Sequence, residues 1–251
     1  MKIALTFDIE RDFPHVLDTF LGVEKGILKI LKMLDKFNIK STFFCTGTVV
    51  ERFPKIIRLI ERKKHEIACH SLDHEHLRNL SFNECEDLIF RNKLLIEDVC
   101  HNSEIVGFRA PYLRPPFFLF KILRKLGFKY DSSIKSPNKL NLYQTVDSQI
   151  REFHPLGFST LLRLPLGYRG YRNWIYQKEL AILYFHPWEA TYMKEEILNR
   201  LRGFDKFRQI MFRPDRIINT GNKFTEKITH FIIDSLSRGA EFITLKSELE
   251  D

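Results

Sequence analysis

Apolar residues recur along the chain with two spacings that alternate. Residues 2–7 have the pattern of a strand, and residues 23–37 then carry apolar side chains at helical spacing. The same alternation predicts strands at 41–45, 66–69, 105–108, 161–165, 180–185 and 241–245, and helices at 51–62, 81–99, 116–126 and 224–237. Serial strand and helix units favour parallel strands covered by helices, as a barrel or a doubly wound sheet.

The same pattern indicates one domain over residues 1–251. No linker rich in Pro, Gly or Ser, low-complexity tract or repeat divides the chain, and this length suits a single α/β core. Residues 137–160 have weak periodicity and are predicted to form an excursion or a lid.

Composition and charge then limit the class of protein. With 44% hydrophobic and 29% charged residues, the chain is typical of packed globular proteins. The net charge of +8 is spread among acidic residues along the predicted helices, so nucleic acid is not the favoured partner. The four cysteines form no CxxC pair and are predicted to be buried thiols. Because neither a signal-peptide core nor a long apolar run is visible, we expect a soluble cytoplasmic protein.

Polar residues follow several predicted strands, at the edge where the loops of an α/β barrel form active sites. The two-residue period of a strand places Thr6, Asp8 and Glu10 on one side, so two carboxylates would face one pocket. The alternative is that Asp8 and Glu10 cap the next segment or pair with Arg11.

Two histidines four residues apart, His70 and His74, follow the strand at 66–69. If the chain turns helically there, both imidazoles lie on one face and bind one cation, with a carboxylate from the first strand completing the site. The alternative is that the histidines are structural. His65 and His76 are predicted to be surface residues.

Two further polar groups end strands. Arg109 is suited to hold a carboxylate, and Pro111 restricts the backbone so that the N–H of Tyr112 is aimed into the pocket, although the same residues also suit an ordinary strand exit. His186 follows the apolar run at 180–185 and is suited to donate a proton at neutral pH.

Taken in order, five short segments resemble the polysaccharide deacetylase family, also called carbohydrate esterase family 4 or the NodB-homology domain. They are Thr6-Phe7-Asp8-Ile9-Glu10, His70-Ser71-Leu72-Asp73-His74, Arg109-Ala110-Pro111-Tyr112, Tyr130-Asp131-Ser132-Ser133 and Leu183-Tyr184-Phe185-His186-Pro187-Trp188-Glu189. The resemblance spans residue 3 to about residue 246 and is greatest to the branch with an Asp-x-Glu first motif.

The resemblance implies a distorted (β/α) barrel, usually of seven parallel strands, that hydrolyses acetyl groups of sugars with a divalent metal, here most simply zinc. Asp8 would be the general base, Arg109 would orient it, the N–H of Tyr112 would help to form the oxyanion hole, and His186 would be the general acid. His70 and His74 would be metal ligands. Where the family commonly has a second aspartate this chain has Ile9, so Glu10 would be the third ligand.

Aromatic residues suggest how a sugar would bind. Tyr168 and Trp174, which lie in a segment rich in aromatic and arginine residues, and Trp188 in the last motif are candidate substrate-binding residues, although aromatics there could equally cover the barrel end. Residues 117–125 combine apolar and basic side chains, so peripheral membrane contact is an alternative to packing on the barrel.

The predicted function is therefore removal of acetyl groups, most simply N-acetyl groups, from a sugar, an oligosaccharide or a lipid-linked glycan precursor. One alternative is hydrolysis of another non-peptide C–N bond, of the cyclic amide or imide type, without a metal. The other is a non-catalytic barrel that binds sugar or nucleic acid, which Ile9 in the first motif leaves open.

Overall fold

The computed structural model describes residues 1–13, 16–101, 103–135, 149–157, 159–164 and 167–249, so residues 137–148 of the predicted excursion lie outside the described residues. The strands are β1 (Lys2–Ile9), β2 (Thr42–Cys45), β3 (Glu66–Cys69), β4 (Gly107–Phe108), β5 (Tyr130–Asp131), β6 (Arg151–Glu152), β7 (Leu180–Phe185) and β8 (Glu241–Ile243). The helices are α1 (Ile27–Lys36), α2 (Gly47–Arg52), α3 (Pro54–Arg62), α4 (Phe82–Val99), α5 (Leu119–Lys125), α6 (Tyr168–Ile175), α7 (Met193–Arg200), α8 (Gly203–Phe212) and α9 (Asn222–Ser237).

The strands form one parallel sheet. Seven strands follow in the order β6-β5-β4-β3-β2-β1-β7, and β8 pairs with β1 as an eighth. β1 lies beside β7 along one edge, while its other edge pairs first with β8 over Lys2–Ala4 and then with β2 over Thr6–Ile9. A parallel bridge between Pro155 and Ile182 connects the chain after β6 with β7, so the sheet curls back toward its own edge. The predicted distorted barrel of parallel strands in one α/β domain is confirmed.

Side chains of β1 alternate between the two faces of the sheet. Ile3, Leu5, Phe7 and Ile9 belong to the large core that the helices cover, whereas Ala4 belongs to a second cluster inside the curl, with Phe44, Ala68, Val106 and Tyr130. Because both faces are buried, the strands are apolar almost throughout, as in other parallel sheets. Thr6 and Asp8 follow Ala4 on the inner face, near the end of β1.

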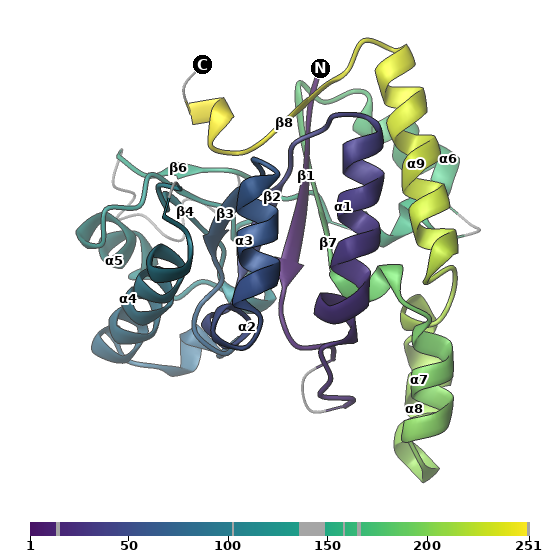
Figure 1. Ribbon diagram of the computed structural model, residues 1–251, viewed down its shortest axis with the longest axis horizontal. Coiled ribbons are helices and arrows are strands. Elements are labelled where there is room, and N and C mark those ends of the chain that lie inside the picture. The colour runs from purple at the N-terminus through teal and green to yellow at the C-terminus, as the bar shows by residue number, and fades with distance from the viewer. Residues whose placement is uncertain (14–15, 102, 136–148, 158, 165–166, 250–251) are drawn as a thin grey trace.

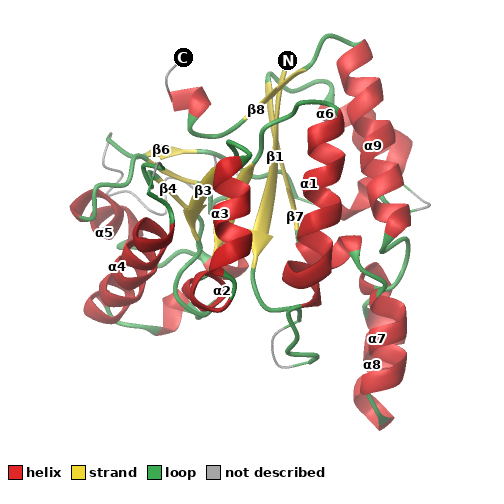
Figure 2. Cartoon of the chain, in the orientation of Figure 1, coloured by secondary structure: helices red, strands yellow, loops and turns green. Residues whose placement is uncertain are grey.

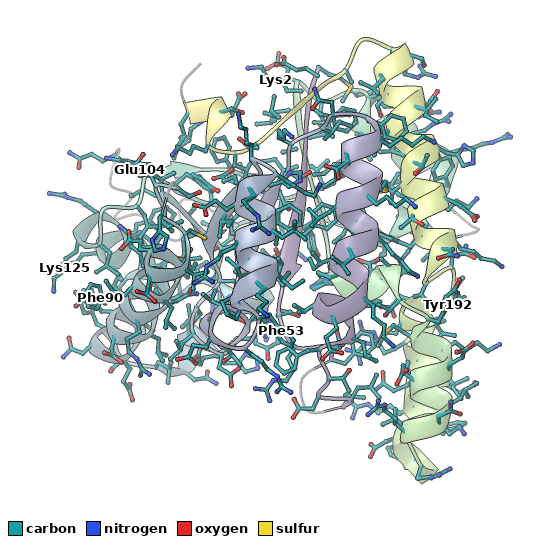
Figure 3. The ribbon with its side chains drawn as sticks, viewed as in Figure 1. Lys2, Phe53, Phe90, Glu104, Lys125 and Tyr192 are labelled. Carbon is teal, nitrogen blue, oxygen red and sulfur yellow. The ribbon has the colours of Figure 1, made fainter. Side chains whose placement is uncertain are left out.

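Helices cover the outer face, with α1 and α3 in front of β1 and β2 (Figures 1 and 2). α4 begins at a capping box in which Ser81 and Glu84 each bind the other's backbone N–H. Charged side chains project outward on this side of the molecule, among them Lys125 on α5 and Glu104 in the loop between α4 and β4 (Figure 3). None of the helices in the described part of the chain is long and apolar enough to cross a membrane.

The sequence expectations hold for most elements, but one expected strand and the expected exposure of His65 are wrong. Residues 159–162 form a 3₁₀ turn and Arg163 is buried in an ion pair, so the strand expected at 161–165 is wrong over residues 161–164, the part that the structure describes. His65 is buried rather than exposed, and its Nδ1 accepts the N–H of Ser41. The four cysteines are buried and free, as expected. In α5 the apolar residues, Leu119 and Phe120 among them, pack into the core, which leaves Phe117 as the large exposed apolar side chain of that segment.

Candidate functional site

Asp8 ends the inner face of β1 and is held by a buried arginine. Its Oδ1 accepts a hydrogen bond from Arg109 Nη1 at 2.7 Å, and the same Nη1 also donates to Thr6 Oγ1 at 2.9 Å. Asp8 is 4% exposed and Arg109 is fully buried. The sequence prediction that Arg109 follows its strand and holds Asp8 therefore matches the geometry.

Arg109 is itself fixed on every side. Its Nε donates to the carbonyl oxygen of Ser132, its Nη2 donates to Ser132 Oγ, and its guanidinium lies 4.0 Å above the ring of Phe44. All three guanidinium nitrogens are thus bonded, so a buried cation is satisfied and cannot rotate away from Asp8. The motif containing Ser132 supports the arginine.

Three side chains beyond the strand ends come together as a potential metal site. One ligand atom from each of Glu10, His70 and His74 lies within 4.8 Å of the others. Glu10 Oε2 is 2.5 Å from His74 Nε2 and 3.4 Å from His70 Nε2. Asp12, the other acidic residue nearby, instead accepts hydrogen bonds from Gly22 and Thr19. Ile9 lies in the core.

The histidines converge by a route different from the expected helical turn. Ser71 and His74 have left-handed backbones, with φ of 64° and 60°, so the loop reverses without forming a helix. His70 Nδ1 lies 2.7 Å from the carbonyl oxygen of Arg109. Because a carbonyl only accepts, Nδ1 carries a proton and Nε2 is directed toward Glu10, so in the neutral ring Nε2 is the nitrogen that can bind a metal.

The charge on Glu10 is strongly favoured. Burial by itself would raise the pKa of this carboxyl, but His74 and His70 outweigh it and hold the pKa far below its usual range. Glu10 Oε2 and His74 Nδ1 are nevertheless buried atoms without a hydrogen-bond partner among the described residues. A buried anionic oxygen beside two imidazole nitrogens is a donor set that fits a divalent cation of the zinc type.

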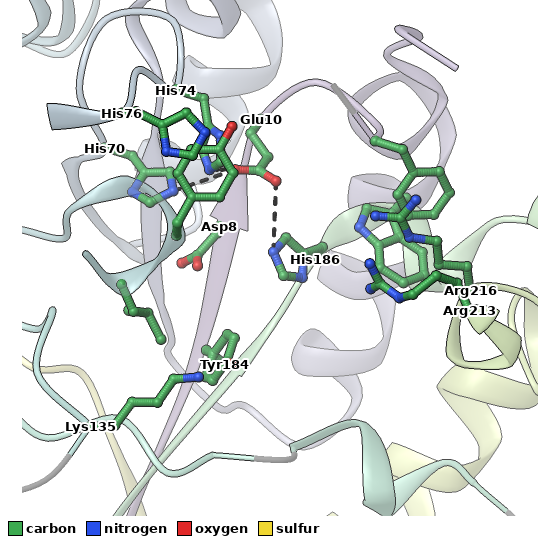
Figure 4. Close-up of a pocket in the computed structure, with 14 residues that line it drawn as sticks. Asp8, Glu10, His70, His74, His76, Lys135, Tyr184, His186, Arg213 and Arg216 are labelled. Carbon is green, nitrogen blue, oxygen red and sulfur yellow. Dashed lines mark ion pairs between the residues drawn. The ribbon is translucent and has the colours of Figure 1, made fainter. Parts of the chain in front are cut away.

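His186 lies beside this cluster, where the extended chain leaves β7. Its Nε2 is 3.7 Å from Glu10 Oε1 (Figure 4). Burial favours the neutral imidazole, yet the surrounding carboxylates, Glu189 first, raise the pKa of His186 to about 9. At neutral pH this histidine is therefore protonated.

Glu189 is a buried partner of His186 that the sequence did not single out as a site residue. Its Oε1 accepts the backbone N–H of His186 at 3.0 Å and is 3.9 Å from Nδ1 of the ring. Its other oxygen accepts from Arg163 Nε. Burial opposes its ionisation, but Arg163 and His186 lower the pKa of this carboxyl below its usual value. The His-Pro-Trp-Glu spacing was the available signal for Glu189, whereas nothing local marked Arg163.

Asp8, the Glu10, His70 and His74 cluster, and His186 line one cavity of about 440 Å³. It is lined by Asp8, Glu10, Phe13, His70, His74, His76, Tyr112, Leu113, Lys135, Tyr184, His186, Trp188, Arg213 and Arg216 (Figure 4). Of the three expected substrate-binding residues, Trp188 is in this lining and Tyr168 and Trp174 are not. Those two lie on α6, where the ammonium of Lys227 on α9 lies over the Tyr168 ring.

Tyr112 and His76 form part of the cavity wall, and His76 is exposed as expected. Its ring stacks on His76 with centroids 3.9 Å apart and meets His74 edge-on at 4.3 Å. The backbone of Tyr112 is left-handed, with φ of 60°. Such conformations are uncommon for a bulky residue and concentrate at functional sites.

The sequence of this chain matches a family model and several known proteins. Residues 1–130 match the sequence model of the family described as polysaccharide deacetylase. A peptidoglycan deacetylase of Helicobacter pylori is 30% identical over 111 residues, which are 44% of this chain and 38% of that protein. A chitooligosaccharide deacetylase of Azorhizobium caulinodans is 28% identical over 128 residues, which are 51% of this chain and 56% of that protein. The match thus spans only part of each of these two relatives, from about two fifths to somewhat more than half of its length.

Solved structures share the fold over nearly the whole chain. A CE4 family pseudoenzyme from Bacillus anthracis superimposes with a TM-score of 0.60 at 15% identity, covering 98% of this chain and 64% of that one. A family 4 carbohydrate esterase of Bacillus subtilis gives a TM-score of 0.58 at 16% identity, covering 98% and 79%. Since the same fold occurs in a pseudoenzyme, an activity has to be argued from the side chains of the site.

Proposed function

The chain belongs to the polysaccharide deacetylase family, and we propose that it is a metal-dependent hydrolase that removes acetyl groups from an amino sugar. The observation that carries this proposal is the position of Asp8, fixed by Arg109, in the same cavity as Glu10, His70 and His74. Hydrolysis of an acetamide needs an electrophilic centre, a base and an acid in reach of one bond. This cavity contains candidates for all three.

Glu10, His70 and His74 would hold the cation, for which zinc is the simplest choice. A carboxylate with two neutral imidazoles is a common set of ligands at catalytic zinc sites. When bound, such an ion polarises the acetyl oxygen and lowers the pKa of water. Its charge would also satisfy Glu10 Oε2, which lacks a hydrogen-bond donor.

Asp8 would serve as the base. Arg109 holds one carboxylate oxygen in place at 2.7 Å, and the side chain forms part of the cavity wall. A carboxylate held in one orientation in the cavity wall is placed to take a proton from an attacking water.

His186 would serve as the acid. An amine leaves an amide only if its nitrogen is protonated, so the donor must carry a proton at the working pH. With a pKa raised to about 9, His186 meets this condition at neutral pH. Glu189 holds the backbone of His186 by accepting its N–H. Trp188 holds the ring by stacking on it, with ring centroids 5.7 Å apart.

The substrate class follows from the relatives and the wall of the cavity. The curated relatives are named for peptidoglycan and chitooligosaccharide deacetylation, and both substrates contain N-acetylated sugars. Tyr184, Trp188 and Tyr112 supply aromatic surface for a sugar ring, and Lys135, Arg213 and Arg216 supply positive charge. We therefore expect an N-acetylated glycan, with an anionic one favoured over a neutral one.

The test is acetate release from N-acetylated chitooligosaccharides by protein whose metal content has been measured. We expect a stoichiometric divalent ion, loss of activity in chelator and recovery when zinc is restored. Asp8→Asn should lower the rate by a factor of about 10² to 10⁴ while the fold is kept. Asp18→Asn, which alters an exposed carboxylate paired with Arg11, is the matched control.

Two results would exclude the proposal. Full activity of metal-free protein on a cyclic amide or imide, with none on acetylated sugars, would identify a different C–N hydrolase. Sugar binding without turnover at any metal content would identify a binding protein. Asp8→Asn with most of its activity left would remove Asp8 from the role of base.

A further inference from the structure

α8 presents large apolar side chains to solvent. Phe204, Phe207, Met211 and Phe212 are 73%, 51%, 59% and 69% exposed, and Ile210 is 39% exposed. These five occupy one ten-residue helix, Gly203–Phe212. Scattered exposed apolar residues are normal on proteins, whereas such a cluster marks an interaction surface.

α8 buries a polar side chain and exposes apolar ones, which is the reverse of an ordinary surface helix. Its single buried residue is Gln209, whose Oε1 accepts a hydrogen bond from Arg216 Nη1. At 100° per residue, Phe204, Phe207 and Met211 fall within one narrow arc, on the side of the helix away from Gln209. The polar residue thus faces the protein while the apolar arc faces outward.

Positive charge is concentrated in the segment that contains this arc. Residues 200–216 contain six basic and two acidic residues, so this segment holds half of the chain's net charge of +8. Arg202 and Arg208 are exposed, at the start and in the middle of the helix. An apolar stripe flanked by cations is the pattern of helices that lie in the interface of a membrane with anionic lipids.

α8 also lies where docking would affect the candidate site. It projects beyond the end of the sheet toward which β1 runs, which is the end that carries Asp8 and Glu10 (Figure 1). Arg213 directly follows the helix, and both it and Arg216 line the cavity. A surface that covers α8 would therefore lie near the cavity wall.

We propose that α8 is an interfacial helix that docks the protein onto an anionic lipid surface. The occupant is a membrane rather than a second copy of the chain, because two copies would bring the same cationic segments together. Docking would place the cavity beside lipid headgroups and glycans attached to them. This surface differs from the segment at 117–125, whose apolar residues pack largely into the core.

Vesicle co-sedimentation tests the proposal without any turnover. The full chain is mixed with vesicles of phosphatidylcholine alone and of phosphatidylcholine with phosphatidylglycerol at 3:1. We expect binding to the second kind, weakened by salt. The combined variant Phe204→Ser, Phe207→Ser and Phe212→Ser should bind at least about tenfold less. Its acetate release from soluble oligosaccharides should be unchanged, since none of these residues lines the cavity.

The matched control removes three exposed apolar residues elsewhere, Phe90→Ser, Phe117→Ser and Leu236→Ser, and should bind as the parent does. Phe90 lies on the side of the molecule opposite α8 (Figure 3). If the α8 serine variant does not fold, the charge variant Arg202→Glu with Arg208→Glu should lose binding to the anionic vesicles.

Absence of parent binding to anionic vesicles overturns the proposal, as does undiminished binding of the α8 variants. A parent dimer in light scattering that the serine variant converts to a monomer also overturns it, because α8 would then be a contact between copies.

Discussion

Arg163 and Glu189 form an ion pair that is closed to solvent on both sides, with side chains 0% and 1% exposed. The Arg163 guanidinium also donates to the carbonyl oxygens of Asp215 and Ile218. Glu189 in turn binds the N–H of His186. The pair therefore connects the loop after α8 with the histidine of the cavity, and the charge of Glu189 acts on that histidine at short range.

Glu189→Gln keeps the shape of the side chain and removes its charge. We expect the pKa of His186 to fall by about one unit or more, because the carboxylate that favours the imidazolium is lost. The alkaline limb of the pH–rate profile should move down by the same amount. NMR titration of the His186 ring gives the pKa directly, and Glu226→Gln, at an exposed position of α9, is the control. An unchanged titration would show that Glu189 acts on His186 only through its hydrogen bond to the backbone.

Because Gly26 has no side chain, the helical turn Gly22–Gly26 packs directly against the backbone of Pro187, the residue after His186. A Cβ at Gly26 would lie 2.1 Å from the carbonyl oxygen of Pro187, which no rotation of a side chain relieves. Gly26→Ala should therefore cost about 1–3 kcal/mol in unfolding free energy and lower the rate by displacing His186. Gly170→Ala, where no atom lies within 4 Å, should be neutral or stabilising in α6. Urea unfolding and acetate release measure both effects. Equal unfolding free energies and equal rates of acetate release in the two variants would contradict this prediction.

The sequence predicted those parts of the site that follow from local geometry. The two-residue period of a strand is fixed by the backbone, so Thr6 and Asp8 share the inner face as expected. Parallel strands that end at one edge bring His70 and Arg109 together, also as expected. The His70 and His74 pair was predicted through the wrong turn, because a left-handed residue other than glycine gives little signal in composition.

The parts that depend on tertiary contacts were missed. Arg163 lies 26 residues before Glu189, and its apolar neighbours suggested a strand. Tyr168 and Trp174 were grouped with the site by composition, but α6 places them outside the cavity. Likewise, β5 and β6 are only two residues long each, which is too short for any period to be visible. The cytoplasmic location and the role of each site residue stay predictions.

His65 should make stability depend on pH. Burial, with help from nearby lysines, lowers the pKa of His65 to about 4 from its ordinary value near 6.5. The unfolded chain therefore binds a proton between these values that the folded chain refuses, so stability is complete above pH 6.5 and is lost as the pH falls toward 4. The unfolding free energy lost over this pH range through His65 is about 3 kcal/mol at most.

His65→Gln keeps an acceptor for the Ser41 N–H and removes the titration. Its unfolding free energy in urea should vary less between pH 7 and pH 4.5 than that of the parent. His101→Gln changes an exposed histidine and should follow the parent curve. A parent and a His65→Gln variant with parallel curves would show that His65 is not the group responsible.

Tyr130→Phe tests the buried hydrogen bonds that hold the Glu66 carboxyl. Glu66 accepts from Tyr130 Oη at 2.6 Å and from Thr42 Oγ1 at 2.6 Å, and burial still raises the pKa of this carboxyl. Removing the phenol hydroxyl leaves a buried oxygen without that donor, so we expect a loss of about 1–3 kcal/mol in urea unfolding.

The pH dependence of this loss identifies its cause. Burial raises the pKa of Glu66, and its deprotonation creates the charge that the hydroxyl stabilises, so the loss should be larger at an alkaline pH than at an acidic one. Tyr192→Phe, at a side chain 49% exposed, should change stability by less than about 0.5 kcal/mol at either pH. If Tyr130→Phe loses the same unfolding free energy at both pH values, Glu66 stays in one protonation state between them. A change in the charge of Glu66 would then not be the cause of the loss.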